Sequence, residues 1–420
     1  MDERFLHHIW KFQKLNGKLQ TIDGQELIVL NQGNHNHNSG PDFEEARIKL
    51  GKIEWAGKIE IHIKSSDWLA HNHHLDKAYE SVILHVVWKH DRAICINNEP
   101  IPTLELCGLV NQNEPKKYLS FIDQRKDILC QDQLPSVSSL TFTNQLDRMM
   151  IERLEQKAVE ILDLTQSQNA DWESITYLSL AKNFGFAVNK EPFLTLALSL
   201  PYKVFAKNTS GLGAEALVFG QSGFLNEKDD AYRQELQREY VFLKSKYGLT
   251  SRLEKQMWKF GRMRPSNFPT VRLAQFAALI KKNKHLFSTL IEIENPKDVV
   301  KLLDFNVGDY WMLHYDFGKV RKKPGGNLGK STVENLIINT IAPLFAAYSK
   351  YTGNQSYIDK AILILEVLSA ESNQITKKWS AAGQEVKSAF DSQSLIGLYK
   401  NYCTAKRCLE CGIGIEILDK

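Results

Sequence analysis

The segment 53–64 constrains the fold of this chain more than any other, because its last residues alternate strictly between apolar and polar side chains. Successive side chains of a β-strand point to opposite faces, so the isoleucines of this segment share one face. Glu60, His62 and Lys64 then share the other face. The alternation predicts a strand that presents a carboxylate, an imidazole and an amine in a row.

A turn rich in Asn, Gly and Pro, residues 34–42, precedes this strand and ends at Asp42. The run 43–50 that follows reads as a strand, so the two strands are expected to form a hairpin. We expect the hairpin to carry Asp42 close to Glu60, where their side chains assemble a metal site.

The bulk composition is that of an ordinary globular protein. The chain has 420 residues, 43% of them hydrophobic and 24% charged, and a formal net charge of +4. Its length predicts two or three domains, and its weakly basic charge permits a polyanionic partner without requiring one. No apolar run reaches the roughly 18 residues of a membrane span, and the first residues lack a secretory signal pattern. Six cysteines indicate reduced thiols, so we expect a cytoplasmic protein without membrane association.

The histidines and the hydrophobic periodicity divide the chain in two. Ten of the 12 histidines lie within the first 90 residues, where the expected order is helix, three strands, short helix, strand. Beyond about residue 115, apolar residues recur at helical spacing in most segments. We therefore predict an α+β protein: an αβββαβ domain with a mixed sheet at 1–112, followed by a mostly α-helical bundle at 113–420.

The order αβββαβ, with Pro41-Asp42 opening the hairpin and Glu60-x-His62 on its second arm, resembles the core of the PD-(D/E)XK phosphodiesterase superfamily. That resemblance implies a nuclease-like domain in which Asp42 and Glu60 bind a divalent cation, Mg²⁺ or Mn²⁺. The lysine of the family motif is replaced here by His62, and Lys64 on the same strand face is an alternative for its role.

The leading hypothesis is therefore a metal-dependent phosphodiesterase acting on nucleic acid. Two carboxylates on one metal neutralise phosphate charge and lower the pKa of a bound water, and a neighbouring base such as His62 or Lys64 orients that water. A related alternative is a non-catalytic nucleic-acid-binding module that keeps a nuclease-like core. The absence of the motif lysine favours this alternative.

A second hypothesis places Zn²⁺ at the histidines. His71 and His73 flank one residue, a spacing that lets both bind one metal, and His85 lies in an apolar run at 82–88 that predicts a strand buried on both faces. With Asp42 these residues suggest a hydrolase of a small substrate. The alternatives are a surface loop for His71 and His73 and a core histidine for His85.

The chain as a whole also resembles an uncharacterised family of bacterial proteins of similar length. The segments that carry this resemblance are Ser39-Gly-Pro-Asp-Phe43, Glu60-Ile-His62, Trp68-x-x-His71-x-His73, Leu84-His85-Val-Val87, Phe219-Gly-Gln-Ser-Gly-Phe224, Arg264-Pro-Ser-Asn-Phe-Pro269 and the terminal cysteines. It implies no activity.

Two groups of cations in the second part suit phosphate contacts. They are Arg262, Arg264 and Arg272 among aromatic residues, and Arg321, Lys322 and Lys323 in a basic loop. The alternatives are a structural elbow for the first group and a solvated loop for the second. The glycine-rich segment that follows the loop has Pro324 where a nucleotide-binding P-loop needs its first glycine, so no P-loop is expected.

Three cysteines are bunched at the end of the chain. Cys403, Cys408 and Cys411 lie within nine residues and can hold three corners of a Zn²⁺ site or an iron–sulfur cluster. Candidates for the fourth ligand are Cys130, Cys107 and Cys95. The alternative is that small buried thiols pack against the helices.

Overall fold

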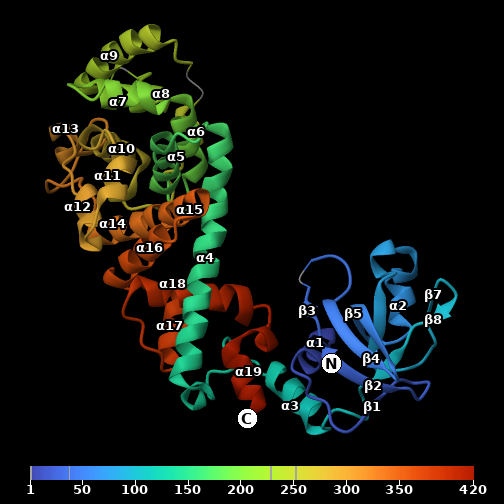
Figure 1. Cartoon of the computed structure of the whole chain (residues 1–420). Helices are drawn as coiled ribbons and strands as arrows, with labels where there is room; N and C mark the ends of the chain where they lie inside the picture. The colour runs from blue at the N-terminus through green and yellow to red at the C-terminus, as the bar shows by residue number, and fades with distance from the viewer. Residues whose placement is uncertain (1, 37, 228, 251–252) are drawn as a thin grey trace. The chain divides into compact units, whose positions relative to one another are not determined.

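The computed structural model describes residues 2–36, 38–227, 229–250 and 253–420, and it divides into two compact units. Unit 1 comprises Met1–Gln145 together with Tyr399–Lys420, and unit 2 comprises Leu146–Leu398. Unit 1 holds a mixed sheet and unit 2 is helical, which confirms the predicted fold class (Figure 1). The boundary expected at residue 112 falls inside unit 1, because the segment after the sheet and the end of the chain both pack in that unit.

The sheet of unit 1 runs in the order β1-β2-β4-β5-β6-β9, and β3 pairs with β4. Its strands are β1 (Leu19–Gln20), β2 (Glu26–Asn31), β3 (Asn34–His35), β4 (Phe43–Leu50), β5 (Ile53–Lys64), β6 (Val82–Lys89) and β9 (Thr103–Glu105). Pairing is antiparallel from β1 to β5 and parallel from β5 through β6 to β9. A small hairpin of β7 (Cys95–Ile96) and β8 (Glu99–Pro100) lies outside this sheet.

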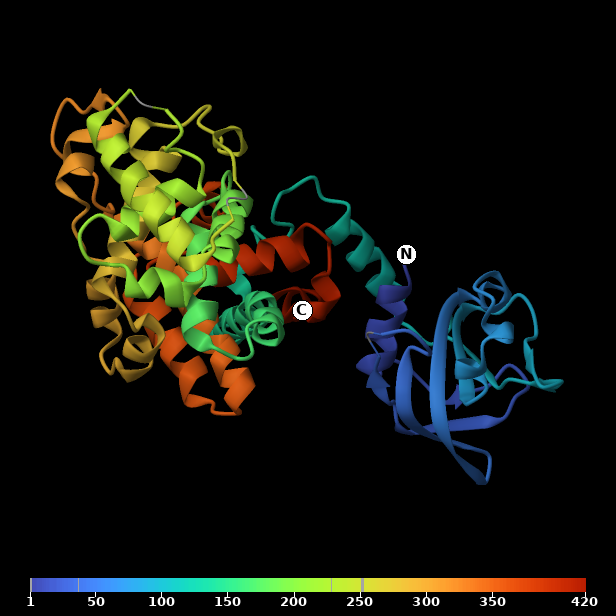
Figure 2. The ribbon, with the colours of Figure 1, turned by 90° about the horizontal axis from the view of Figure 1, so that it is seen from above.

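Helix α1 (Glu3–Lys11) packs against β5 and buries Phe5, Leu6, Ile9 and Trp10. Asp2 caps it by accepting from the backbone N–H of Phe5. The apolar run of β6 is buried from Val82 to Val87, as its sequence predicts. The predicted order of helix, three strands, short helix and strand is therefore found in α1, β2, β4, β5, α2 (Asp67–Ala70) and β6. Figure 2 shows these elements from above.

The segment between β5 and β6 departs from expectation. A single helix is expected over 71–79, but α2 ends at Ala70 and two short 3₁₀ turns follow, His73–Leu75 and Lys77–Tyr79. Asn72, just before the first of these turns, has a left-handed φ of 62°, a conformation that asparagine tolerates better than most residues. The chain therefore changes direction after α2 instead of running on as a helix.

Unit 1 is completed by α3 (Asn113–Ile122), the 3₁₀ turn Leu134–Ser136 and the returning C-terminal segment. That segment holds a π-helical turn, η8 (Tyr399–Cys403), a 3₁₀ turn, η9 (Cys408–Glu410), and α19 (Gly412–Asp419). The N–H of Ser138 donates to Glu416 at 2.8 Å, and the N–H of Gly412 donates to Gln145 at 2.8 Å. These bonds fasten the end of the chain to the first part of unit 1.

Unit 2 is built from helices. After α4 (Ser139–Ser167), which spans the division, they are α5 (Trp172–Phe184), α6 (Lys190–Ser199), α7 (Tyr202–Lys207), α8 (Gly213–Gln221), α9 (Ala231–Tyr247), α10 (Pro269–Lys282), α11 (Leu286–Glu292), α12 (Val299–Leu302), α13 (Asp309–Leu313), α14 (Lys330–Leu336), α15 (Ala342–Thr352), α16 (Ser356–Val367), α17 (Gln374–Ala381) and α18 (Ala389–Leu398). A π-helical turn, Ile337–Ile341, joins α14 to α15, and a short hairpin of β10 (His314–Asp316) and β11 (Lys319–Val320) follows α13.

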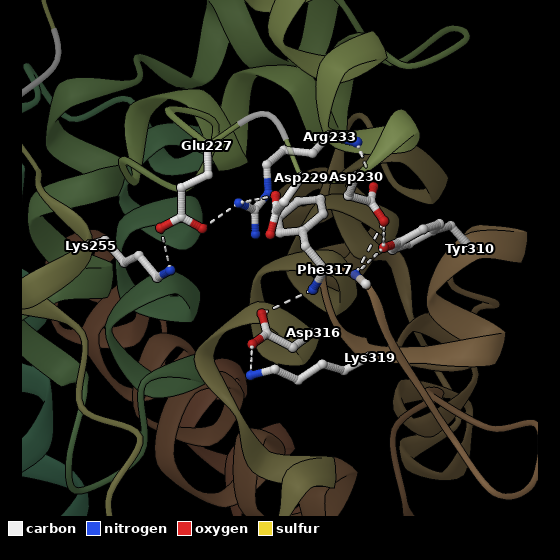
Figure 3. A network of polar contacts seen from close by, with 10 residues as sticks. Glu227, Asp229, Asp230, Arg233, Lys255, Tyr310, Asp316, Phe317 and Lys319 are labelled. Carbon is white, nitrogen blue, oxygen red and sulfur yellow. Dashed lines mark hydrogen bonds and ion pairs between the residues drawn. The ribbon is translucent and has the colours of Figure 1, made fainter.

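A polar network joins α9 to the β10–β11 hairpin (Figure 3). The buried guanidinium of Arg233 pairs with Glu227 at 2.5 Å and Asp229 at 2.7 Å, and it lies 4.4 Å from the ring centre of Phe317. Asp230 caps α9 and accepts from the hydroxyl of Tyr310 at 2.7 Å. The network joins segments 80 to 88 residues apart in the sequence and stabilises the packing of the hairpin on α9.

In the described part of the chain, the helices are all too short or too polar to cross a bilayer.

Candidate metal and active site

The two predicted carboxylates meet in the structure. The register of β4 on β5 pairs Phe43 with Ile59, which brings Asp42 beside Glu60. The backbone N–H of Asp42 donates to Oε2 of Glu60 at 3.1 Å, and the N–H of Ile61 donates to Oδ2 of Asp42 at 2.9 Å. Glu60 thus accepts a hydrogen bond from the backbone of Asp42, and Asp42 accepts one from the residue that follows Glu60. The two carboxyl groups are therefore held side by side.

Local hydrogen bonds hold Asp42 in this position. The side-chain amide of Asn36 donates to the carbonyl oxygens of Ser39 at 3.2 Å and Pro41 at 3.1 Å, and the backbone N–H of Asn36 donates to the carbonyl of Asp42 at 2.8 Å. The Asn/Gly/Pro turn predicted from sequence therefore closes on itself and delivers the carboxylate to the start of β4.

The imidazole rings of three histidines gather in one group, and two of them contact Glu60. Nε2 of His62 lies 3.6 Å from Oε1 of Glu60, and Nε2 of His73 lies 3.2 Å from the same oxygen. Nδ1 of His71 lies 3.1 Å from Nε2 of His62. One ligand atom from each of the three rings falls within 4.8 Å of the other two, the arrangement of a group that can hold one metal ion.

His85 forms a layer behind this group. Its Nε2 lies 2.9 Å from Nδ1 of His62, and β6 buries it completely. The contact fixes the ring of His62 with Nε2 facing the carboxylates. His85 was expected among the direct metal ligands. Because His62 lies between it and Glu60, His85 can instead orient the imidazole ring of His62.

Burial controls the protonation of the cluster. It lowers the pKa of His62 to about 2 and that of His85 to about 3, and neighbouring histidines add to the effect. The pKa of His73 is also lowered, first by burial. Burial and the charge of Asp42 raise the pKa of Glu60 to about 9. His62, His73 and His85 are therefore neutral at neutral pH, the state in which imidazole nitrogens bind metals.

Two buried nitrogen atoms test whether a metal fits here. Among the described residues, neither Nε2 of His7 nor Nε2 of His73 has a hydrogen-bond partner, although each lies 3.2 Å from a carboxylate oxygen. Buried polar atoms normally have partners, and a cation held between these nitrogens and the carboxylates would give both a partner. The residues present fit a divalent cation.

Helix α1 contributes two groups that the sequence reasoning missed. His7 lies 3.2 Å from Oδ2 of Asp42, and burial raises the pKa of Glu3, which is sensitive to the charges of Asp42 and His71. The available signal was their spacing: residues four apart lie on one helix face, so Glu3 and His7 point the same way.

Aromatic rings form one wall of the site. The ring of Tyr79 stacks on His73 with centroids 3.9 Å apart and an interplanar angle of 22°. The fully buried ring of Trp68 meets His85 edge-on at 5.2 Å and His73 at 5.5 Å. This packing fixes the orientation of the imidazole rings of His73, in the first 3₁₀ turn, and His85, on β6.

The site faces an open pocket. Its lining residues are Asn38, Ser39, Gly40, His71, Asn72, His73, Leu75, Asp76 and Tyr79. Six of these nine residues are exposed, so the pocket is a shallow surface hollow and not an enclosed chamber.

Lys64 stands apart from this group. It is exposed at the end of β5, and its backbone N–H donates to Asp67 at 2.8 Å. No contact in the described structure joins its ammonium to Asp42, Glu60 or His62. Among the strand residues expected to act together, the structure thus groups Glu60 with His62 and leaves Lys64 outside.

The predicted cations lie in unit 2. Arg262, Arg264, Lys322 and Lys323 are exposed, and Arg321 donates to the carbonyl of His314 at 2.9 Å. Arg272 was expected to contact a nucleic-acid backbone. It is only 7% exposed, so it is not available for such a contact. Its guanidinium bonds Asn267 and Gln275 instead.

The cysteines separate into two kinds. Cys95 and Cys107 are exposed, whereas Cys130, Cys403, Cys408 and Cys411 are wholly or partly buried in unit 1. Of the three candidates for a fourth ligand, Cys130 is the one that the structure places with the terminal cysteines.

Fold and site together define a class of protein: a mixed-sheet domain that holds a cluster of histidines and carboxylates, joined to a helical unit. The chain belongs to the family described as protein of unknown function (DUF2851), whose model matches residues 3–374. No curated protein and no solved structure matches the chain.

Proposed function

We propose that unit 1 is a metal-dependent phosphodiesterase domain that cleaves nucleic acid. The observation that carries this proposal is the pair of reciprocal backbone bonds that holds Asp42 against Glu60, with the imidazole rings of His62 and His73 facing Glu60 and the ring of His71 against His62. The strand order supports it as well, since β5 is antiparallel to β4 and parallel to β6, as expected for an αβββαβ core of the PD-(D/E)XK type.

The ligand set favours a particular kind of metal. Carboxylates alone suit Mg²⁺, whereas imidazole nitrogens beside carboxylates suit Mn²⁺ or Zn²⁺. Asp42, Glu60, His62 and His73 would hold the ion, which when bound neutralises phosphate charge and acidifies a water molecule. His62 takes the motif position of the lysine, and its lowered pKa makes it a neutral ligand, not a cation.

The other residues of the site have distinct roles in this proposal. His7 faces Oδ2 of Asp42 and orients that carboxylate. His71 is the exposed imidazole of the cluster and lines the pocket, so it is the group best placed to accept a proton from an incoming water. His85 holds the ring of His62 from behind.

The open pocket favours a polymeric substrate. Pockets for small molecules bury most of the ligand surface, and a hollow with six exposed residues among nine does not. A nucleic-acid strand can lie across such a surface with only the reacting phosphate at the metal. The alternative, a Zn²⁺-dependent hydrolase of a small substrate, draws its support from the close grouping of His62, His71 and His73.

The test is cleavage of labelled single-stranded DNA, duplex DNA and RNA by the full chain with Mg²⁺, Mn²⁺ or Zn²⁺. We expect Mn²⁺-supported cleavage that Asp42→Asn and Glu60→Gln reduce at least 100-fold. Glu54→Gln is the matched control, because Glu54 is an exposed glutamate on the same strand. Turnover of a small phosphodiester without cleavage of any nucleic acid would favour the alternative. Nucleic-acid binding without turnover in any metal would point to a non-catalytic module and overturn the proposal.

A further inference from the structure

Unit 2 buries an arginine that has no negative charge beside it. Arg272 lies in the first turn of α10, whose residues 269–277 are all buried, and its own exposed fraction is 7%. Among the described residues, no carboxylate influences its pKa, which burial lowers to about 10. A buried cation without a counter-charge is costly, so the surroundings of this side chain need an explanation.

Two neutral amides hold the guanidinium in place. Its Nη1 donates to Oε1 of Gln275 at 2.9 Å, and its Nη2 donates to Oδ1 of Asn267 at 2.7 Å. The side-chain nitrogen of Gln275 donates in turn to the carbonyl of Gly326 at 2.5 Å, so the amide oxygen is left to face the arginine. Amide oxygens accept hydrogen bonds but carry no net charge. These bonds therefore position the guanidinium without neutralising it.

The guanidinium also keeps an unused donor. In the described part of the chain, the buried Nε of Arg272 has no hydrogen-bond partner. The guanidinium carbon lies 4.6 Å from the ring centre of Phe186, a contact that stabilises a cation but supplies neither an acceptor nor a charge. An anion beside the guanidinium would give Nε a partner and the cation its counter-charge.

Arg272 lines a pocket in which such an anion can be bound. The pocket has a volume of about 410 Å³, within the range of roughly 300–1,000 Å³ that is typical of small-molecule sites. Ser331, Thr332 and Asn335, all on α14, line it as well. Their hydroxyl and amide groups are hydrogen-bond donors, and the planar fork of an arginine matches the two oxygens of a carboxylate or phosphate.

Much of the remaining lining is apolar. It includes Phe184, Phe186, Val188, Phe193 and Met263. An inorganic anion would contact the arginine and leave these side chains uncovered. A molecule that joins an oxyanion to an apolar body would contact both parts of the lining and would bury apolar surface as well.

We propose that this pocket binds a small organic anion, a carboxylate or a phosphate ester, whose oxyanion contacts Arg272 and whose apolar body lies against the apolar part of the lining. The hydroxyl groups of Ser331 and Thr332 add hydrogen bonds to the same oxyanion. The site lies within unit 2 and shares no residue with the carboxylate and histidine cluster of unit 1, so it does not depend on the phosphodiesterase proposal.

The test is calorimetric titration of the full chain with benzoate and with phenyl phosphate at constant ionic strength. We expect saturable binding of at least one of them to the wild type and at least tenfold weaker affinity in Arg272→Met. Arg238→Met is the matched control, because Arg238 is exposed on α9 and is not part of the pocket lining. The tighter of the two probes identifies the oxyanion. Binding of phenyl phosphate to a metal in unit 1 would persist in Arg272→Met, which separates the two sites.

Acetate and inorganic phosphate test the apolar part of the pocket. They carry the same oxyanions without the ring, so we expect each to bind at least tenfold more weakly than its aromatic counterpart. Equal affinities would contradict the apolar body. Failure of all four probes to bind the wild type, or equal affinity in Arg272→Met, would overturn the proposal.

A second variant keeps the test decisive if Arg272→Met does not fold. Gln275→Glu retains the arginine and places a carboxylate at the oxygen that already faces it, so the protein supplies its own counter-charge. We expect this variant to bind the probes at least tenfold more weakly than the wild type, and unchanged affinity would overturn the assignment to Arg272. Thermal unfolding gives an independent readout, because a bound anion should raise the Tm of the wild type and of Arg238→Met but not that of Gln275→Glu.

Discussion

At the scale of single residues, the site depends on contacts that fix which nitrogen of each imidazole faces the carboxylates. Nδ1 of His62 is occupied by His85, so its Nε2 faces Glu60 and His71. The sequence indicated a row of polar groups on β5 but gave no sign of this pairing, since His85 lies within an apolar run on another strand. Sequence spacing describes one strand at a time, whereas the pairing depends on the parallel register of β5 and β6, which sets Glu60 opposite His85.

We predict that His85→Asn weakens metal binding by about 10- to 100-fold, the usual effect of removing a partner that orients a metal-bound histidine. The affinity for Zn²⁺ or Mn²⁺, measured by competition with a chromophoric chelator, checks this. His74→Asn is the control, because His74 is exposed next to His73 and lies outside the cluster. An unchanged affinity in His85→Asn would show that the ring of His62 needs no support.

A second prediction concerns His8, on the buried side of α1. Burial, with a contribution from Lys14, lowers its pKa from 6.5 to about 4. The unfolded chain therefore binds this proton more tightly, so His8 stabilises the fold above pH 6.5 and the contribution is lost as pH falls from 6.5 toward 4. We expect the free energy of unfolding of the wild type to fall over this window by up to about 3 kcal/mol more than that of His8→Gln. Urea unfolding at several pH values measures the difference, and parallel curves would contradict the assignment.

At the scale of elements, the sequence predicted best those strands whose apolar residues alternate with polar ones between clear turn residues. Strands β4 and β5 were placed within a residue of their observed bounds, because the alternation and the turn residues agree there. Helix α8 gives no comparable sequence signal. It is buried on nearly all sides, from Gly213 to Gln221, so its sequence lacks the amphipathic period by which a surface helix is recognised.

The close packing of α8 gives a third prediction. A Cβ on Gly220 would lie 2.2 Å from the ring of Tyr240, on α9, so the two helices meet where only glycine fits. Gly220→Ala is expected to destabilise the protein by about 1–3 kcal/mol through overpacking. Gly261→Ala is the matched control, because no atom lies within 4 Å of the corresponding Cβ. Denaturant midpoints compare the two, and equal midpoints would mean that α9 shifts without cost.

At the scale of the whole molecule, sequence periodicity separated a mixed sheet from a helical part but could not show where the last residues belong. The terminal segment was read as the end of the helical bundle, yet Tyr399–Lys420 belongs to unit 1. Nothing local marks this return. It depends on contacts such as the bond from Lys117 to the carbonyl of Leu418 at 2.7 Å, which joins residues 301 positions apart.

This return makes a specific prediction for a chain that ends at Leu398. Such a truncation removes α19 and with it the acceptors and donors that bond Ser138, Gln145 and Lys117, and it also exposes the apolar surface that Ile413 and Leu418 bury. Because these contacts lie within unit 1, we expect the sheet of unit 1 to lose protection while the core of unit 2 keeps it.

Hydrogen exchange read by mass spectrometry measures both units in one experiment. Peptides from β5 and β6 are expected to exchange at least tenfold faster in the truncated chain than in the full chain, and peptides from α5 and α10 at an unchanged rate. A matched control is Glu416→Gln in the full chain, which weakens the bonds to Ser138 and keeps the apolar contacts of α19, so its effect should be smaller. Faster exchange in α5 and α10 with no change in β5 and β6 would show that the terminal segment stabilises unit 2, because only the unit that loses its own contacts should open more often.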